Sequence, residues 1–213
     1  MNYKFLFALI LFYKISFSQT KKWDTYDLDS IVSIDLPFTV YEIDTINDNR
    51  KIYQIYSGND SLEFIAQKLY LGKVYSNVEI PPLPHDHNSL EKYYSNITWL
   101  FTESSKYDLA HTKQMNKFNL KGYKLTFNNK NDIAVNEVCF FIINKNFYSF
   151  SYTNTNGLNE FERENFFDSI IFNSESELIQ YHEKPFSIGK KALIFLLLFL
   201  LLSFLLRLKS KKK

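Results

Sequence analysis

Cysteine and glycine are scarce in this sequence, which excludes disulfide-stapled scaffolds and nucleotide-binding proteins built on glycine-rich loops. The single cysteine, Cys139, has no second cysteine in the chain to bond with, so packing must hold the fold together. Five glycines in 213 residues leave no P-loop and no dinucleotide fingerprint. Cys139 lies in the apolar run "VCFFII", where we expect a small buried side chain and not a reactive thiol.

The central part of the chain also lacks a cluster of positive charge. The whole sequence has a net charge of +2, but residues 190–213 carry basic residues and no acidic one. The part between this tail and residues 1–18 is therefore acidic, with dispersed charges. Because binding to nucleic acid needs clustered lysine and arginine, we expect no nucleic-acid partner. No hydrolase or metalloprotease motif is present either, so we assign no catalytic residue and expect no cofactor.

The C-terminal end contains a long apolar run, from Ala192 to Leu206. A helix over this run is about 22 Å long, shorter than the roughly 30 Å core of a bilayer. Flanking residues such as Lys190 and Arg207 extend the span, because their long side chains reach the lipid headgroups. A tail that is cut off for a lipid anchor stays apolar to its end, whereas this one ends in basic residues. We predict a transmembrane helix at 190–208 and a basic cytoplasmic tail at 209–213.

The N-terminal end is typical of a secretory signal peptide at 1–18. A nine-residue apolar run from Phe5 to Tyr13 is too short to span a bilayer, and Ser18 is a small residue suited to cleavage before Gln19. An uncleaved anchor is the alternative. With the positive-inside rule, the two ends predict a single-pass protein of the cell membrane, with an extracytoplasmic (periplasmic) body and a cytoplasmic C-terminus.

The exported body, 19–173, contains short runs rich in aromatic and β-branched residues, which predict an antiparallel sheet of about six or seven strands. "GND" at 58–60 and "NKN" at 144–146 are predicted hairpin turns between such runs. The following segment, 174–189, is polar and is predicted to be a stalk. Helices are predicted at 88–105 and within "GLNEFERENFFDS".

The first predicted helix has one apolar face, within about 120° of arc. Asn88 followed by Glu91 is typical of a capping box at its start. Trp99 projects from the opposite side. We expect a neighbouring loop to cover Trp99, and the alternative is that Trp99 contacts a partner.

The segment "PPLPHDHNS" holds the only combination of residues with a metal hypothesis, His85 and His87. Three nearby prolines predict a loop, whereas two histidines at this spacing point the same way only on a strand. Zinc sites normally take three or four protein ligands. We therefore interpret the segment as a solvated loop and expect no metal.

The early "SIDLPF", the hairpin around "NKN" and a helix running into "FFDSIIF" together resemble the PsbP-like/Mog-type fold. The resemblance covers roughly residues 25–173. It implies an α+β domain in which helices flank an antiparallel sheet, an α/β/α sandwich. It also implies a binding or accessory role, since the family has no catalytic signature to carry over. The composition and the "SFSQ" region resemble exported Bacteroidetes-type proteins.

We therefore expect a membrane-tethered, extracytoplasmic binding or accessory module, joined to the membrane through 190–208, with an unknown protein or small molecule as partner. The alternative is an exported hydrolase that holds a metal ion through His85 and His87. The predicted fold class is an α+β domain followed by one C-terminal transmembrane helix.

Overall fold

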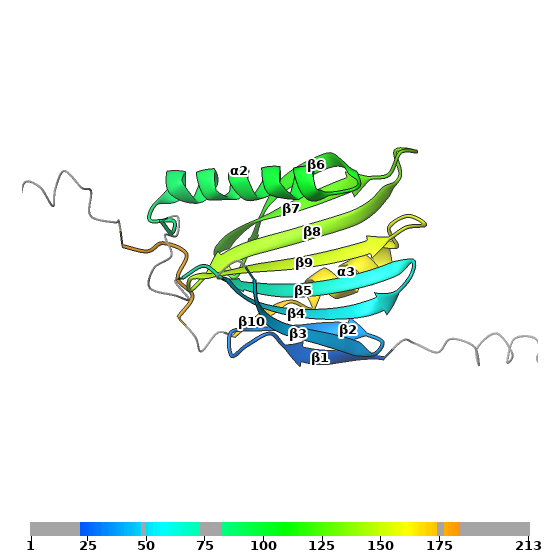
Figure 1. Cartoon of the computed structure of the whole chain (residues 1–213), viewed down its shortest axis with the longest axis horizontal. Helices are drawn as coiled ribbons and strands as arrows, with labels where there is room; N and C mark the ends of the chain where they lie inside the picture. The colour runs from blue at the N-terminus through cyan, green and yellow to red at the C-terminus, as the bar shows by residue number, and fades with distance from the viewer. Residues whose placement is uncertain (1–21, 48–49, 73–81, 174–176, 184–213) are drawn as a thin grey trace, which may run out of the picture.

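The computed structural model describes residues 22–47, 50–72, 82–173 and 177–183. These residues form ten strands and two helices (Figure 1). In chain order the elements are β1 (Trp23–Asp27), β2 (Val32–Pro37), β3 (Val40–Asn47), β4 (Arg50–Asn59), β5 (Leu62–Tyr70), α2 (His87–Ser104), β6 (Asp108–Lys117), β7 (Leu120–Asn128), β8 (Ala134–Ile143), β9 (Asn146–Asn154), α3 (Glu160–Asp168) and β10 (Ile171–Phe172).

The strands form two sheets. The large sheet has seven strands in the order β3-β4-β5-β9-β8-β7-β6, and all its neighbours are antiparallel. The small sheet has the order β1-β2-β10. Both predicted hairpins are confirmed, because β4 pairs with β5 and β8 pairs with β9. In the second turn Asn144 and Lys145 have φ of 50° and 63°, the left-handed backbone that two-residue hairpin turns require.

One hydrophobic core lies between the large sheet and a layer made of the small sheet and α3. Val32, Ile34 and Leu36 point into it from β2, because alternate residues of a strand share a face. Phe64 packs at its centre, stacked on Tyr152 with ring centroids 5.1 Å apart.

A second core lies on the other face of the large sheet, beneath α2. Leu90 and Tyr94 of α2 are fully buried there. The sheet contributes Val138, Phe140 and Ile142 from β8, while the residues between them point into the first core. Strand β8 is therefore buried on both faces, which explains its nearly continuous apolar sequence.

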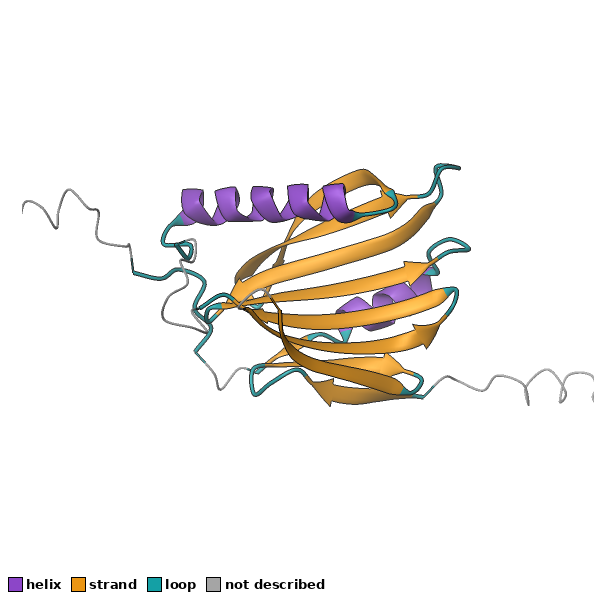
Figure 2. Cartoon of the chain, in the orientation of Figure 1, coloured by secondary structure: helices purple, strands orange, loops and turns teal. Residues whose placement is uncertain are grey.

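The predicted fold class, an α+β sandwich of a sheet between helices with a C-terminal transmembrane helix, is wrong. The structure is mostly β, and α2 is the helix on one face of the large sheet (Figure 2). A second sheet, together with the short helix α3, covers the other face. No helix in the described ranges is long and apolar enough to span a bilayer, and the predicted span at 190–208 lies outside those ranges.

The N-cap of helix α2 lies two residues earlier than its sequence predicts. Its N-cap is Asp86, whose side chain accepts a 2.8 Å hydrogen bond from the Ser89 amide. The Ser89 hydroxyl in turn accepts a 2.9 Å bond from the Asp86 amide, which completes a capping box. Glu91, the expected capping partner, instead forms an ion pair with Lys121 of β7.

Residues 177–183, within the segment predicted as a stalk, lie against the body. The Asn144 amide donates to the Ile179 carbonyl at 2.9 Å, and the His182 amide donates to the Pro84 carbonyl at 2.7 Å. The Gln180 side chain is 7% exposed and donates to the Lys121 carbonyl at 2.8 Å. Described residues of this segment are thus fixed at the end of the large sheet where α2 begins.

Candidate binding groove beside helix α2

Helix α2 covers just part of one face of the large sheet. Its rings contact β8 and β9, for example Phe101 with Phe140 at 5.7 Å between centroids and with Phe147 at 6.4 Å. On the same side, no helix of the described residues lies over β5, β4 and β3 (Figure 2). Because the helix stops short of these strands, a groove opens along its margin.

The groove has a volume of about 430 Å³, within the range of small-molecule sites. Its floor comes from the strands and its wall from α2. The floor consists of Leu69, Leu71 and Phe147. Along the wall run Tyr93, Asn96, Ile97, Leu100, Phe101 and Ser104, and Arg50 completes the lining.

The wall follows from helical geometry. Relative to the buried Tyr94, the side chains of Tyr93 and Leu100 are turned by about 100° to one side, at the edge of the apolar face. Leu100 is 56% exposed although it continues that face. The apolar face of α2 is therefore wider than the part of it that packs on the sheet. The part that does not pack on the sheet forms one side of the groove.

Arg50 lies at one end of the groove. It is the first residue of β4, and Ile52, two positions on, pairs with Leu69 of the floor. Residues two apart share a face of a strand, so Arg50 projects on the same side as the groove. It is exposed, and no ion pair joins it to a carboxylate of the described residues. Among the described residues that line the groove, Arg50 alone carries a formal charge.

Tyr93 is a polar side chain of the helix wall that lies within electrostatic range of Arg50. Burial raises the pKa of Tyr93, and the nearby Arg50 opposes this rise in part. The phenol therefore stays protonated at neutral pH and is able to donate a hydrogen bond. This end of the groove thus combines a permanent cation with a neutral hydroxyl donor.

The groove continues along the helix into a second hollow of about 240 Å³. The two share Phe101 and Ser104, and the second is also lined by Phe127, Val138 and Ser151. From Tyr93 to Ser104 the helix rises about 16 Å. The combined hollow is therefore elongated, with Arg50 at one end and Lys106 in the lining of the other.

A polar hollow of about 330 Å³ on the opposite side of the large sheet has a different character. Lys51 and Lys68 line it, but each is paired, Lys51 with Asp44 at 3.6 Å and Lys68 with Asp29 at 2.5 Å. Because both lysines already have carboxylate partners, this hollow is a weaker candidate for an anionic ligand than the groove.

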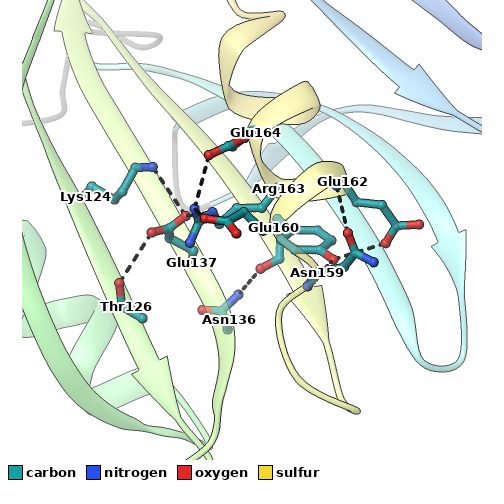
Figure 3. A network of polar contacts seen from close by, with 10 residues as sticks. Lys124, Thr126, Asn136, Glu137, Asn159, Glu160, Glu162, Arg163 and Glu164 are labelled. Atoms are coloured by element: carbon teal, nitrogen blue, oxygen red, sulfur yellow. Dashed lines mark hydrogen bonds and ion pairs between the residues drawn. The ribbon is translucent and has the colours of Figure 1, made fainter.

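Figure 3 shows a buried polar network between α3 and the large sheet. The Glu137 side chain is 8% exposed and lies 3.3 Å from the Lys124 ammonium and 3.8 Å from the Arg163 guanidinium. Arg163 comes from α3, while Lys124 and Glu137 come from neighbouring strands. With a cation on either side, this carboxylate fastens the helix to the sheet.

The residues singled out from the sequence lie outside the groove. His87 is exposed at the first turn of α2, and His85 is half-buried with its Nε2 3.5 Å from an oxygen of Asp86. No group of three or more metal-binding side chains occurs among the described residues. Trp99 is 61% exposed, so no loop among the described residues covers it.

Sequence reasoning missed the groove itself. Leu69 and Phe147 belong to correctly predicted strands. They line a groove because α2 does not extend across the whole face of the sheet, which the sequence does not indicate. The available signal was the apolar arc of the helix, which places Tyr93 and Leu100 at its margin. Arg50 gave no signal, since an isolated arginine beside a turn is ordinary.

A comparison of the sequence with models of known protein families gives no match, and a comparison with curated proteins gives none. Among solved structures, the fold is similar to the solution structure of cyanobacterial PsbP (CyanoP) from Synechocystis sp. PCC 6803. The TM-score is 0.44 and the identity 7%, over 74% of this chain and 96% of that one. No functional property passes from that protein to this chain at such similarity.

Proposed function

We propose that this chain is a binding module without catalytic activity, and that its groove beside α2 holds an elongated apolar ligand. The groove is the observation that carries the proposal. It places Leu69, Ile97 and Phe147 along one continuous hollow and leaves Leu100 open at its margin. Apolar surface that stays hydrated in the free protein gains free energy when a ligand covers it.

The module is further proposed to be tethered to the cell membrane through its apolar segment at 190–208, with the body on the extracytoplasmic side. The sequence supports this part of the proposal through the signal-like start at 1–18 and the basic residues after Arg207. A tethered module of this kind serves a ligand or partner that lies at the membrane surface.

Photolabelling tests the groove in the full chain held in lipid nanodiscs. The probe is a dodecyl chain that carries a photoreactive diazirine, and the labelled peptides are mapped by mass spectrometry. We expect label on peptides of α2 and β5 that contain Ile97 or Leu69. Label spread evenly over the exposed surface, with no enrichment on these peptides, would contradict the proposal.

Two variants sharpen the result. Leu100→Trp places a large ring at the open margin of the groove and should reduce groove labelling several-fold. Ser95→Trp adds the same ring at an exposed position on the outer side of α2 and should leave labelling unchanged. Equal melting temperatures for both variants would show that the difference comes from the groove and not from misfolding.

A further inference from the structure

We propose that the groove selects a single-chain amphiphile with a carboxylate headgroup, that Arg50 binds the carboxylate, and that the tail lies along the floor beneath α2. This inference rests on the proposed function and adds the chemical class of the ligand. A free carboxylic acid is the source we commit to, in preference to a phospholipid.

Electrostatics favour an anionic headgroup. Arg50 provides the one formal charge of the groove lining described above, and that lining contains no aspartate or glutamate. A guanidinium presents donors in a planar fork that matches a carboxylate in bidentate geometry. A cationic headgroup would be repelled by Arg50, and an uncharged headgroup would give Arg50 no partner of opposite charge.

The number of charges favours a monoanion. Lys51, the next cation along β4, pairs with Asp44 and lines the polar hollow on the other side of the sheet. One guanidinium with a neutral Tyr93 hydroxyl balances one negative charge, whereas a phosphate monoester approaches two negative charges at neutral pH. A carboxylate therefore suits this end of the groove.

Shape favours a single chain. The groove lining includes both Tyr93 and Ser104, so the groove follows α2 for about 16 Å. Away from Arg50 the floor is apolar, from Leu69 to Phe147. Within the groove beside α2, one cation at the end of an apolar floor matches a head and a tail.

Competition against the photoprobe measures headgroup preference, with the full chain in nanodiscs of one lipid composition. The competitors are dodecanoate, 1-dodecanol, dodecyl phosphate and dodecyltrimethylammonium. Each is tested on the unmodified chain and on Arg50→Gln, and the ratio of the two inhibitory concentrations is the readout. Partition of each competitor into the lipid cancels in this ratio.

We expect Arg50→Gln to weaken competition by dodecanoate about tenfold, because a charge-assisted hydrogen bond is lost. Competition by 1-dodecanol should be unchanged. Lys51→Gln is the matched control, since it removes a neighbouring cation on the opposite face, and it should leave every ratio near one. Dodecyltrimethylammonium should compete poorly with the unmodified chain and better with Arg50→Gln.

Three results would overturn parts of the inference separately. An unchanged dodecanoate ratio would remove Arg50 as the headgroup ligand while leaving the groove in place. A larger loss for dodecyl phosphate than for dodecanoate would assign the site to phosphate esters instead. Absence of groove labelling by the photoprobe itself would refute the proposed function, and the headgroup inference would fall with it.

Discussion

At the scale of single residues, Cys139 illustrates how burial controls reactivity. It is fully buried in β8, and burial raises the pKa of its thiol to about 12 despite the opposing effect of Lys124 and Lys117. The thiolate is the reactive form of cysteine. We therefore expect no reaction with a water-soluble thiol reagent at pH 8 in the native protein, and full reaction in denaturant. Fast labelling of the native protein would contradict this burial.

Asp29 is a residue on which the pH dependence of stability should depend. Burial raises the pKa of its carboxyl, but hydrogen bonds from Lys68, Tyr148 and two backbone amides outweigh this and hold the pKa below its usual value. Asp29 joins the loop between β1 and β2 to the large sheet through Lys68 and Tyr148. The charged carboxylate thus stabilises the folded state.

Replacing Asp29 by Asn should lower the free energy of unfolding by about 2 kcal/mol at pH 7, because the ionic partner of Lys68 is lost. A lowered folded-state pKa gives stability that is complete above the unfolded pKa, about 3.9, and is lost as the pH falls through the folded value. Denaturant titrations from pH 7 to pH 2 should show the gap between the two proteins closing below about pH 4. A gap that stays constant to pH 2 would exclude this role.

At the scale of elements, the attachment of α3 depends on the network in Figure 3. Glu137→Ala leaves Lys124 and Arg163 facing each other without their carboxylate, and should cost about 3 kcal/mol of unfolding free energy. Glu160→Ala is the control, because Glu160 also contacts Arg163, at 3.5 Å, but its side chain is 80% exposed. Surface pairs of this kind contribute little, so its effect should stay below about 0.5 kcal/mol. Equal effects in thermal or chemical unfolding would contradict the network.

The sequence predicted those elements whose side chains alternate or repeat strongly. The paired strands β4 and β5, the paired strands β8 and β9, and helix α2 all have such patterns, and all are present. The edge strands β3 and β6 were missed because most of their residues are exposed, so no apolar alternation marks them. The fold class was wrong for a related reason. Strands β1 and β10 have five and two residues, too few for a sequence pattern to indicate a second sheet.

At the scale of the whole molecule, the proposed topology predicts a protease result. With protease added outside cells whose outer barrier is permeabilised, the body should be digested while a tag after Lys213 is spared, because the basic tail would be cytoplasmic. Immunoblots for the body and for the tag report the two halves of the experiment. Loss of the tag while the body survives would reverse the orientation.

The candidate site could be predicted only in its parts. The apolar face of α2 was evident from spacing, including Leu100 at its margin, and the strands of the floor were recognised as strands. Their meeting at a groove was not predictable, because it depends on how far α2 extends over the sheet. Nor could Arg50 be placed there, since its side of β4 follows from the pairing of Ile52 with Leu69.

Strand β8 belongs to both cores, with Cys139 and Phe141 on one side and Phe140 and Ile142 on the other. An amide in β8 therefore exchanges its hydrogen when both layers separate, whereas an amide in α2 needs just the helix to lift from the sheet. Deuterium uptake followed by mass spectrometry should come in two waves, the first over α2 and the last over β8. A substitution that loosens α2 alone should make uptake in α2 faster and leave the rate of uptake in β8 unchanged.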